Sequence, residues 1–162
     1  IMHGEMEAVE NARDYCVQKD FPEQFNSYMT CFIKSGKNGV DNSAVAQACL
    51  ALSDVDPVAI DSCVAKARTE FKIDEDLASG EQYPRFGIDA EASNSYGVQG
   101  SPTLVINGVQ VSAGRTPEAV KDAVCDAFLE APEACNTALS NEGFQPGFGL
   151  DASAATSEAV CG

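Results

Sequence analysis

The sequence predicts an α/β fold in which a helical block precedes a short β-hairpin and a last helix. Apolar residues recur at helical spacing through most of the first 78 residues. The stretch "TLVINGVQVSA" is then typical of strand, turn and strand, because Asn-Gly is the preferred two-residue hairpin turn. One hairpin and one helix are too little sheet to be stable alone, so we expect further strands upstream of Ile1.

Four helices are expected within residues 5–78. The fourth has the clearest start, because Asp56 is a good N-cap and Pro57 suits the first helical position. The stretch "SGKNG" (35–39) separates the second helix from the third. The first three helices are expected to start near Glu5, at Pro22 and near Ser43. The residues of the first helix expected to point inward are Met6, Val9, Cys16 and Val17.

The second half of the chain is more varied. A polar connection over residues 79–95 contains a short helix around Asp89–Ser95, and Thr116 starts the last helix with Pro117 and Glu118 behind it. Residues 136–162 are rich in Gly, Ala and Ser, which predicts a flexible tail.

Seven cysteines in 162 residues favour an oxidising compartment over a reduced one. None is in C-x-x-C spacing, and their separations do not fit a zinc site, so no metal and no cofactor is expected. Four cysteines allow three connectivities. In an antiparallel hairpin turning near residue 20, Cys31 is too far along to reach Cys16. This favours Cys16 with Cys63 and Cys31 with Cys49.

The remaining three cysteines are Cys125, Cys135 and Cys161. Either Cys125 and Cys135 form a disulfide with each other, or one of them bonds Cys161. The odd total leaves a thiol that is free, bonded to another segment, or able to link two chains.

The chain is strongly acidic, with a formal net charge of −15. Such a charge repels phosphate backbones and anionic lipid, which argues against nucleic-acid and membrane-surface partners. No run of apolar residues is long enough to cross a bilayer.

Two stretches resemble known thiol oxidoreductases. "GVQGSPTLVING" resembles the G-V-x-G-T-P-T stretch of DsbA-type proteins, whose proline is cis, and this likeness covers residues 96–130. "HGEMEAVENARDYC" is similar to the signature C-Q-H-G-x-x-E-C-x-x-N-x-x-x-x-C of the gamma-interferon-inducible lysosomal thiol reductases. The matched positions are His3, Gly4, Glu7, Asn11 and Cys16, whereas Ile1 and Ala8 stand where the signature has cysteine and Met2 where it has glutamine.

The resemblance implies a thioredoxin-like domain over residues 1–135, with residues 5–78 as a disulfide-stapled helical insertion and the N-terminal βαβ part upstream of this chain. It implies an extracytoplasmic thiol–disulfide oxidoreductase (secreted, periplasmic, cell-surface or lysosome-like) that acts on protein thiols and disulfides. Its redox C-x-x-C would lie upstream of Ile1, so no catalytic cysteine pair is expected in the chain itself. Pro102 and Ser101 would line the site, together with His3.

A second interpretation keeps the same fold without the chemistry. The chain would then be a redox-inert binding or structural module of an extracellular assembly, with its cysteines as staples. Without the resemblance, Pro102 is equally well explained as a proline that begins a strand. His3 is likewise explained as part of the first helix's N-terminus.

Overall fold

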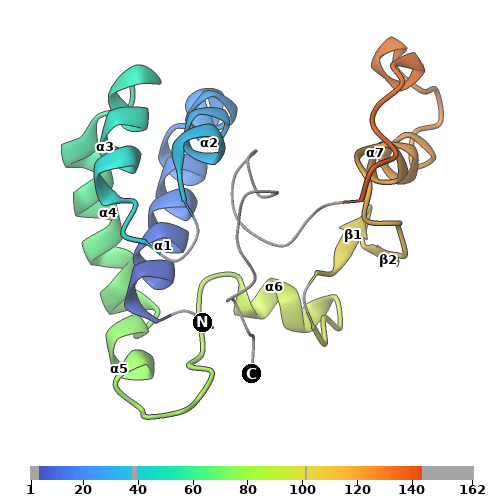
Figure 1. The fold of residues 1–162 in the computed structure, drawn as a ribbon. Coiled ribbons are helices and arrows are strands. Elements are labelled where there is room, and N and C mark those ends of the chain that lie inside the picture. Colours follow the sequence, from blue (N-terminus) through green and yellow to red (C-terminus); the bar gives the residue numbers. More distant parts are fainter. Residues whose placement is uncertain (1–3, 38–39, 101, 144–162) are drawn as a thin grey trace. The chain divides into compact units, whose positions relative to one another are not determined.

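The computed structural model describes residues 4–37, 40–100 and 102–143 of the chain (Figure 1). These residues divide after Ile88 into two compact units. The first unit holds five helices. They are α1 (Glu5–Asp20), α2 (Pro22–Ser35), α3 (Ser43–Leu52), α4 (Pro57–Glu70) and α5 (Ile73–Leu77).

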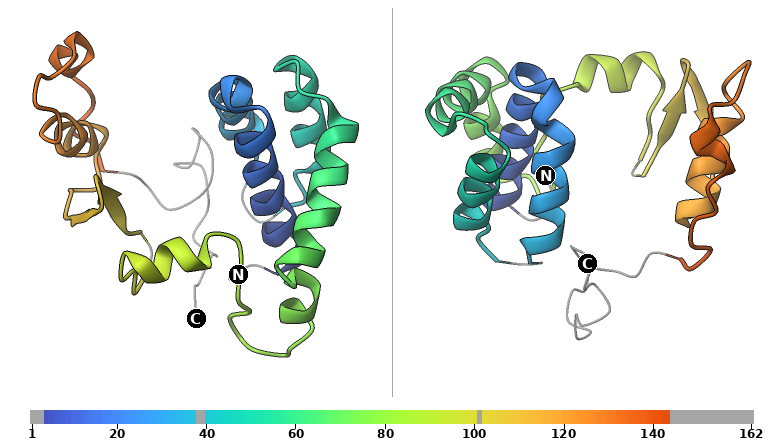
Figure 2. Two further views of the ribbon diagram at one scale, coloured as in Figure 1. Left: turned by 180° about the vertical axis from the view of Figure 1, so that it is seen from behind. Right: turned by 90° about the horizontal axis from the view of Figure 1, so that it is seen from above.

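The first four helices of this unit form a bundle. Consecutive helices are joined by short connections, so neighbours run antiparallel. Helix α1 packs against both α2 and α4, and α2 packs against α3 (Figure 2). Asp56 is the N-cap of α4, as predicted, because its carboxylate accepts a hydrogen bond from the Val58 amide at 2.9 Å.

The bundle has two apolar clusters. The larger one lies among all four helices and includes the fully buried Tyr28, Leu50 and Ile60. The smaller one lies along the seam between α1 and α4 and ends at α5. Its buried members are Ala8, Ala12, Ala67, Ile73 and Ile88. Because alanines line this seam, the two helices can approach closely.

The seam also explains a wrong prediction. Met6 was expected to point inward, but its side chain is 47% exposed. The buried positions of the first turns of α1 are instead the small residues Ala8 and Ala12. Apolar periodicity ranks a methionine above an alanine, whereas close helix packing favours the alanine.

Two disulfides cross the bundle. Cys16 on α1 bonds Cys63 on α4, and Cys31 on α2 bonds Cys49 on α3, with Cα–Cα distances of 5.9 and 5.6 Å. This is the connectivity that hairpin geometry favours. Each disulfide joins two helices that already pack against each other, so both reinforce the bundle.

The second unit contains one two-stranded antiparallel sheet. The register pairs Leu104 with Val111 and Ile106 with Val109. Asn107 and Gly108 both have positive φ, 51° and 81°, as the predicted type I′ turn requires. The unit's elements are α6 (Ala90–Ser95), β1 (Leu104–Ile106), β2 (Val109–Val111), α7 (Pro117–Cys125) and the 3₁₀ turn η1 (Glu133–Asn136).

The predicted α/β thioredoxin-like fold is wrong for this structure. The described residues are 57% helix, the 3₁₀ turn included, and 4% strand, and among them the hairpin is the whole sheet. The reason is physical: the segments with helical periodicity pack on each other and complete their own core, so they do not serve as an insertion that covers a larger sheet. Among the helices described, none is long and apolar enough to cross a membrane.

Candidate functional site

A groove in the second unit passes beside Pro102, where the hairpin meets the start of α7. Its volume is about 790 Å³. The apolar part of its lining includes residues of both strands and the helix, and the polar part includes Gln110 and the charged Arg115. The lining residues are Pro102, Thr103, Leu104, Gln110, Val111, Ser112, Ala113, Gly114, Arg115 and Val120.

Gln110 fixes the loop that leads to Pro102. Its side-chain Nε2 donates to the carbonyl oxygens of Tyr96 and Gly97, at 2.7 and 3.0 Å. Gly97 has a φ of 66°, which lets the chain turn there at no steric cost. Gln110 on β2 therefore holds the loop that follows α6 against the hairpin.

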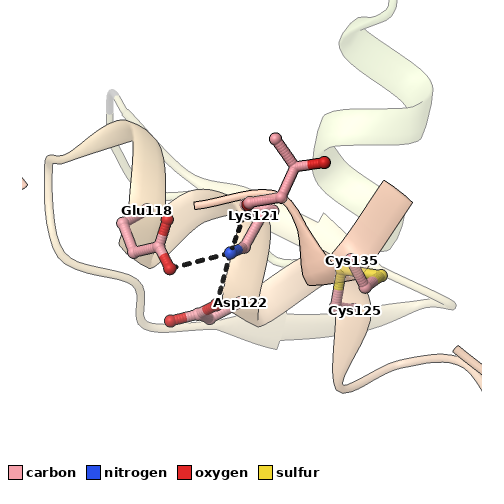
Figure 3. The surroundings of a disulfide bond; sticks show 6 residues. Glu118, Lys121, Asp122, Cys125 and Cys135 are labelled. Carbon is pink, nitrogen blue, oxygen red and sulfur yellow. Dashed lines mark hydrogen bonds and ion pairs between the residues drawn. A yellow bond between two sulfur atoms is a disulfide. The ribbon is translucent and has the colours of Figure 1, made fainter. Parts of the chain in front are cut away.

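The two cations of residues 89–143 have different surroundings. Lys121 forms two ion pairs: its Nζ lies 2.7 Å from a Glu118 carboxylate oxygen and 3.5 Å from a carboxylate oxygen of Asp122 (Figure 3). The hydrogen bond between Lys121 and Glu118 raises the pKa of Lys121 and lowers the pKa of Glu118. Arg115 has no ion pair within the described part of the chain, so its charge is available to the groove.

Glu118 and Lys121 also anchor the segment that follows η1. The second carboxylate oxygen of Glu118 accepts from the Leu139 amide at 2.6 Å, and Lys121 Nζ donates to the Thr137 carbonyl at 2.9 Å. The disulfide between Cys125 and Cys135 closes the same region (Figure 3). Residues 137–140 thus lie along α7, and most of the predicted flexible tail, residues 144–162 of 136–162, falls outside the described part of the chain.

The six described cysteines that form disulfides suit structural rather than catalytic roles. Cys63 is 8% exposed and borders a groove of about 400 Å³ between α1 and α4. Attack on its sulfur would release a thiolate at Cys16, which is fully buried among apolar residues. Burial destabilises a thiolate, so this disulfide is a poor exchange partner. Cys125 lies at the C-terminal end of α7, where the helix dipole also disfavours a thiolate.

The remaining predicted site residues fall outside the described part of the chain. These are His3, Ser101 and Cys161. A cis bond at Ser101–Pro102, and a bond from Cys161 to another cysteine, therefore stay predictions. Pro102 itself is described, and it is exposed at the groove.

Two residues of the groove were missed at the sequence level. Gln110 could have been found, because side chains alternate along the strand "VQV", so the side chain of Gln110 lies on the other face of the sheet from those of Val109 and Val111. Arg115 carries no such signal, since it lies in an irregular segment before the helix.

No group of three His, Cys, Asp or Glu residues in the described ranges could hold a metal ion. Comparison of the chain with profiles of protein families, with curated proteins and with solved structures finds no match. The function must therefore be argued from the residues and their geometry.

Proposed function

We propose that this chain takes part in thiol–disulfide exchange on proteins outside the cytoplasm, as the part that receives the substrate segment. The observation that carries the proposal is the groove beside Pro102. It borders a hairpin whose strands pair only with each other among the described residues. An extended peptide could add to such an edge through main-chain hydrogen bonds and place alternate side chains in the groove.

The groove's residues suit an extended protein segment. Leu104, Val111 and Val120 supply apolar contacts, and Arg115 supplies a positive charge that can pair with a carboxylate of the substrate. Gln110 has a positioning role, because its hydrogen bonds hold the loop at Tyr96 and Gly97.

The exchanging thiol would not be one of the paired cysteines. The sequence resemblance favours a C-x-x-C upstream of Ile1. Its first thiolate would attack one sulfur of a substrate disulfide, and the other substrate sulfur would leave as a thiolate. The second thiol of the pair would then attack the mixed disulfide and release the reduced substrate, leaving the C-x-x-C oxidised.

The proposal is tested by insulin reduction with dithiothreitol as the electron donor. Two proteins are compared: this chain, and the same chain extended by whatever the gene encodes upstream of Ile1. We expect turnover from the extended protein and none from this chain alone. In the extended protein, Arg115→Ala should raise KM for an acidic peptide disulfide more than for a neutral one. Absence of turnover from both proteins would refute exchange activity.

A second function is favoured by the disulfides themselves. Every described cysteine is bonded, and two of the three bonds fix a bundle with its own core. A rigid, redox-inert module that binds proteins in an extracellular assembly would look the same. A mature N-terminus at Ile1, measured by mass spectrometry of the natural protein, would favour this function over exchange.

A further inference from the structure

The contact between α1 and α2 contains a buried polar cluster. Three side-chain atoms in it lie buried without a hydrogen-bond partner: Arg13 Nε, Asp14 Oδ1 and Tyr28 Oη. Tyr28 is fully buried, and the Arg13 side chain is only 7% exposed. Buried polar atoms are rarely left unpartnered, because each loses its hydrogen bonds to water. The cluster therefore needs an explanation beyond packing.

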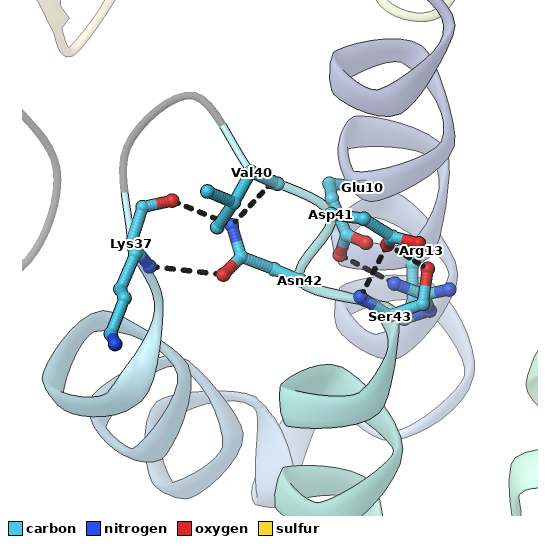
Figure 4. Close-up of polar contacts among 7 residues, drawn as sticks. All are labelled: Glu10, Arg13, Lys37, Val40, Asp41, Asn42 and Ser43. Atoms are coloured by element: carbon cyan, nitrogen blue, oxygen red, sulfur yellow. Dashed lines mark hydrogen bonds and ion pairs between the residues drawn. The ribbon is translucent and has the colours of Figure 1, made fainter.

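Carboxylates outnumber cations around this cluster. Arg13 is already paired with Glu10, whose carboxylate oxygen lies 2.5 Å from a terminal guanidinium nitrogen. Asp41, in the loop before α3, faces the same guanidinium, although its oxygen accepts from the Ser43 amide at 2.8 Å (Figure 4). Asp14 is thus a further carboxylate beside a single arginine. An ionised Asp14, which is half-buried with its Oδ1 shielded from solvent, leaves uncompensated negative charge there.

We propose that Asp14 is a proton-dependent lock between α1 and α2, which closes when its carboxyl group takes up a proton from weakly acidic medium. The neutral carboxyl removes the surplus charge beside Glu10. The Tyr28 hydroxyl can hydrogen-bond to the group in either state, as donor to the carboxylate or as acceptor from the neutral acid, so the surplus charge and not this bond sets the direction of the effect. This property is separate from thiol exchange and does not depend on it.

The groups that face the cluster fix the direction of the effect. Burial, the largest cause, and the Glu10 carboxylate raise the pKa of Asp14, whereas the Arg13 guanidinium and the Tyr28 hydroxyl lower it, and the net value is about 6. Burial also raises the pKa of Tyr28, so its hydroxyl stays protonated at neutral pH. On the other side of α1, α4 contributes Lys66 and Glu70, which line the groove beside Tyr15 rather than this cluster.

The sign of the pH dependence follows. The ordinary pKa of an aspartate, 3.8, applies to the unfolded chain, so the folded chain holds the proton more tightly. Stability from this group is therefore complete below about pH 4 and is lost as the pH rises through about 6. Two pKa units correspond to a change of about a hundred-fold in the unfolding equilibrium constant.

The test compares urea unfolding of the full chain and of its Asp14→Asn variant between pH 4 and pH 7.5. Asparagine has the shape of aspartate but does not titrate. We expect the ratio of the wild-type to the variant unfolding constant to rise by about fifty-fold from pH 4 to pH 7, because the unfolded group is already partly ionised at pH 4. The matched control is Asp61→Asn, an exposed aspartate on α4, for which the ratio should not change. A pH-independent ratio for Asp14→Asn would overturn the proposal.

A direct measurement covers the case in which the variant fails to fold. The ¹³C chemical shift of the Asp14 side-chain carboxyl is followed by NMR across the same pH range in the wild-type chain. A midpoint near 6 supports the lock, and a midpoint near 4 contradicts it. In Tyr28→Phe the midpoint should rise, because a hydroxyl that can donate to the ionised carboxylate is lost, whereas an unchanged midpoint would exclude an interaction between Tyr28 and Asp14.

Discussion

The two disulfides of the bundle should differ in how much they stabilise it. The perturbation is the removal of one disulfide at a time by a pair of alanine substitutions, Cys16→Ala with Cys63→Ala, or Cys31→Ala with Cys49→Ala. Each double variant leaves no unpaired thiol from the disulfide it removes. The main effect of such a crosslink is to restrict the unfolded chain, and this effect grows with the length of the loop it closes.

The magnitudes follow from the sequence separations. The bond between Cys16 and Cys63 spans 47 residues, and that between Cys31 and Cys49 spans 18. The loop-entropy relation then gives a stabilisation of about 4 kcal/mol for the first and about 3 kcal/mol for the second at 25 °C. Whole domains are stable by only about 5–15 kcal/mol, so either loss brings the bundle close to unfolding.

The assay is guanidinium unfolding followed by circular dichroism at 222 nm, with the free energy of unfolding extrapolated to water. Leu52→Ala is the control, because Leu52 is 78% exposed and its removal should change the free energy of unfolding by less than about 0.5 kcal/mol. We expect the larger loss for the Cys16 and Cys63 variant. A larger loss for the Cys31 and Cys49 variant would show that local packing, not loop entropy, sets the contribution of these bonds.

Three further substitutions test local features. Asp56→Ala removes the N-cap of α4 and should cost about 1 kcal/mol in thermal unfolding, whereas Asp56→Asn, which keeps a cap, should cost little. Gly87→Ala should lower the melting temperature, because its Cβ would lie 2.9 Å from the Phe71 carbonyl oxygen; an unchanged value would show that this loop can move. Glu118→Gln should lower the hydrogen-exchange protection factor of the Leu139 amide, and acidification of the wild type below the lowered pKa of Glu118 should lower this protection factor as well.

Local rules predicted the elements whose start or turn is set by a few adjacent residues. Pro22 and Pro57 begin helices, and the Asn107-Gly108 turn has the backbone conformation that its residues favour. The disulfide pairing in the bundle was accessible for the same reason, since the short connection at Phe21 makes α1 and α2 antiparallel and limits which cysteines can meet.

Features that depend on distant packing were not predictable in this way. Helix α5 (Ile73–Leu77) has too few residues to show a helical period, and Ile73 is buried because it completes the seam between α1 and α4. Likewise, Val9 and Val17 were expected to point inward, but nothing in the sequence marked Arg13 as a buried residue. That this arginine is buried beside Asp14 and Tyr28 follows from the way α2 packs, which no spacing rule contains.

The difference between local rules and distant packing also explains why the two sequence resemblances did not predict the fold. One resemblance lies at the start of α1, and the other lies on a loop that leads into a hairpin. A helix start and a hairpin turn are local structures, and many folds can contain both. What decides the architecture here is the close seam of Ala12 and Ala67, locked by the bond between Cys16 and Cys63. Because that seam needs small residues about 55 positions apart, it leaves no local pattern, and only the packed structure reveals that the helices form a core of their own.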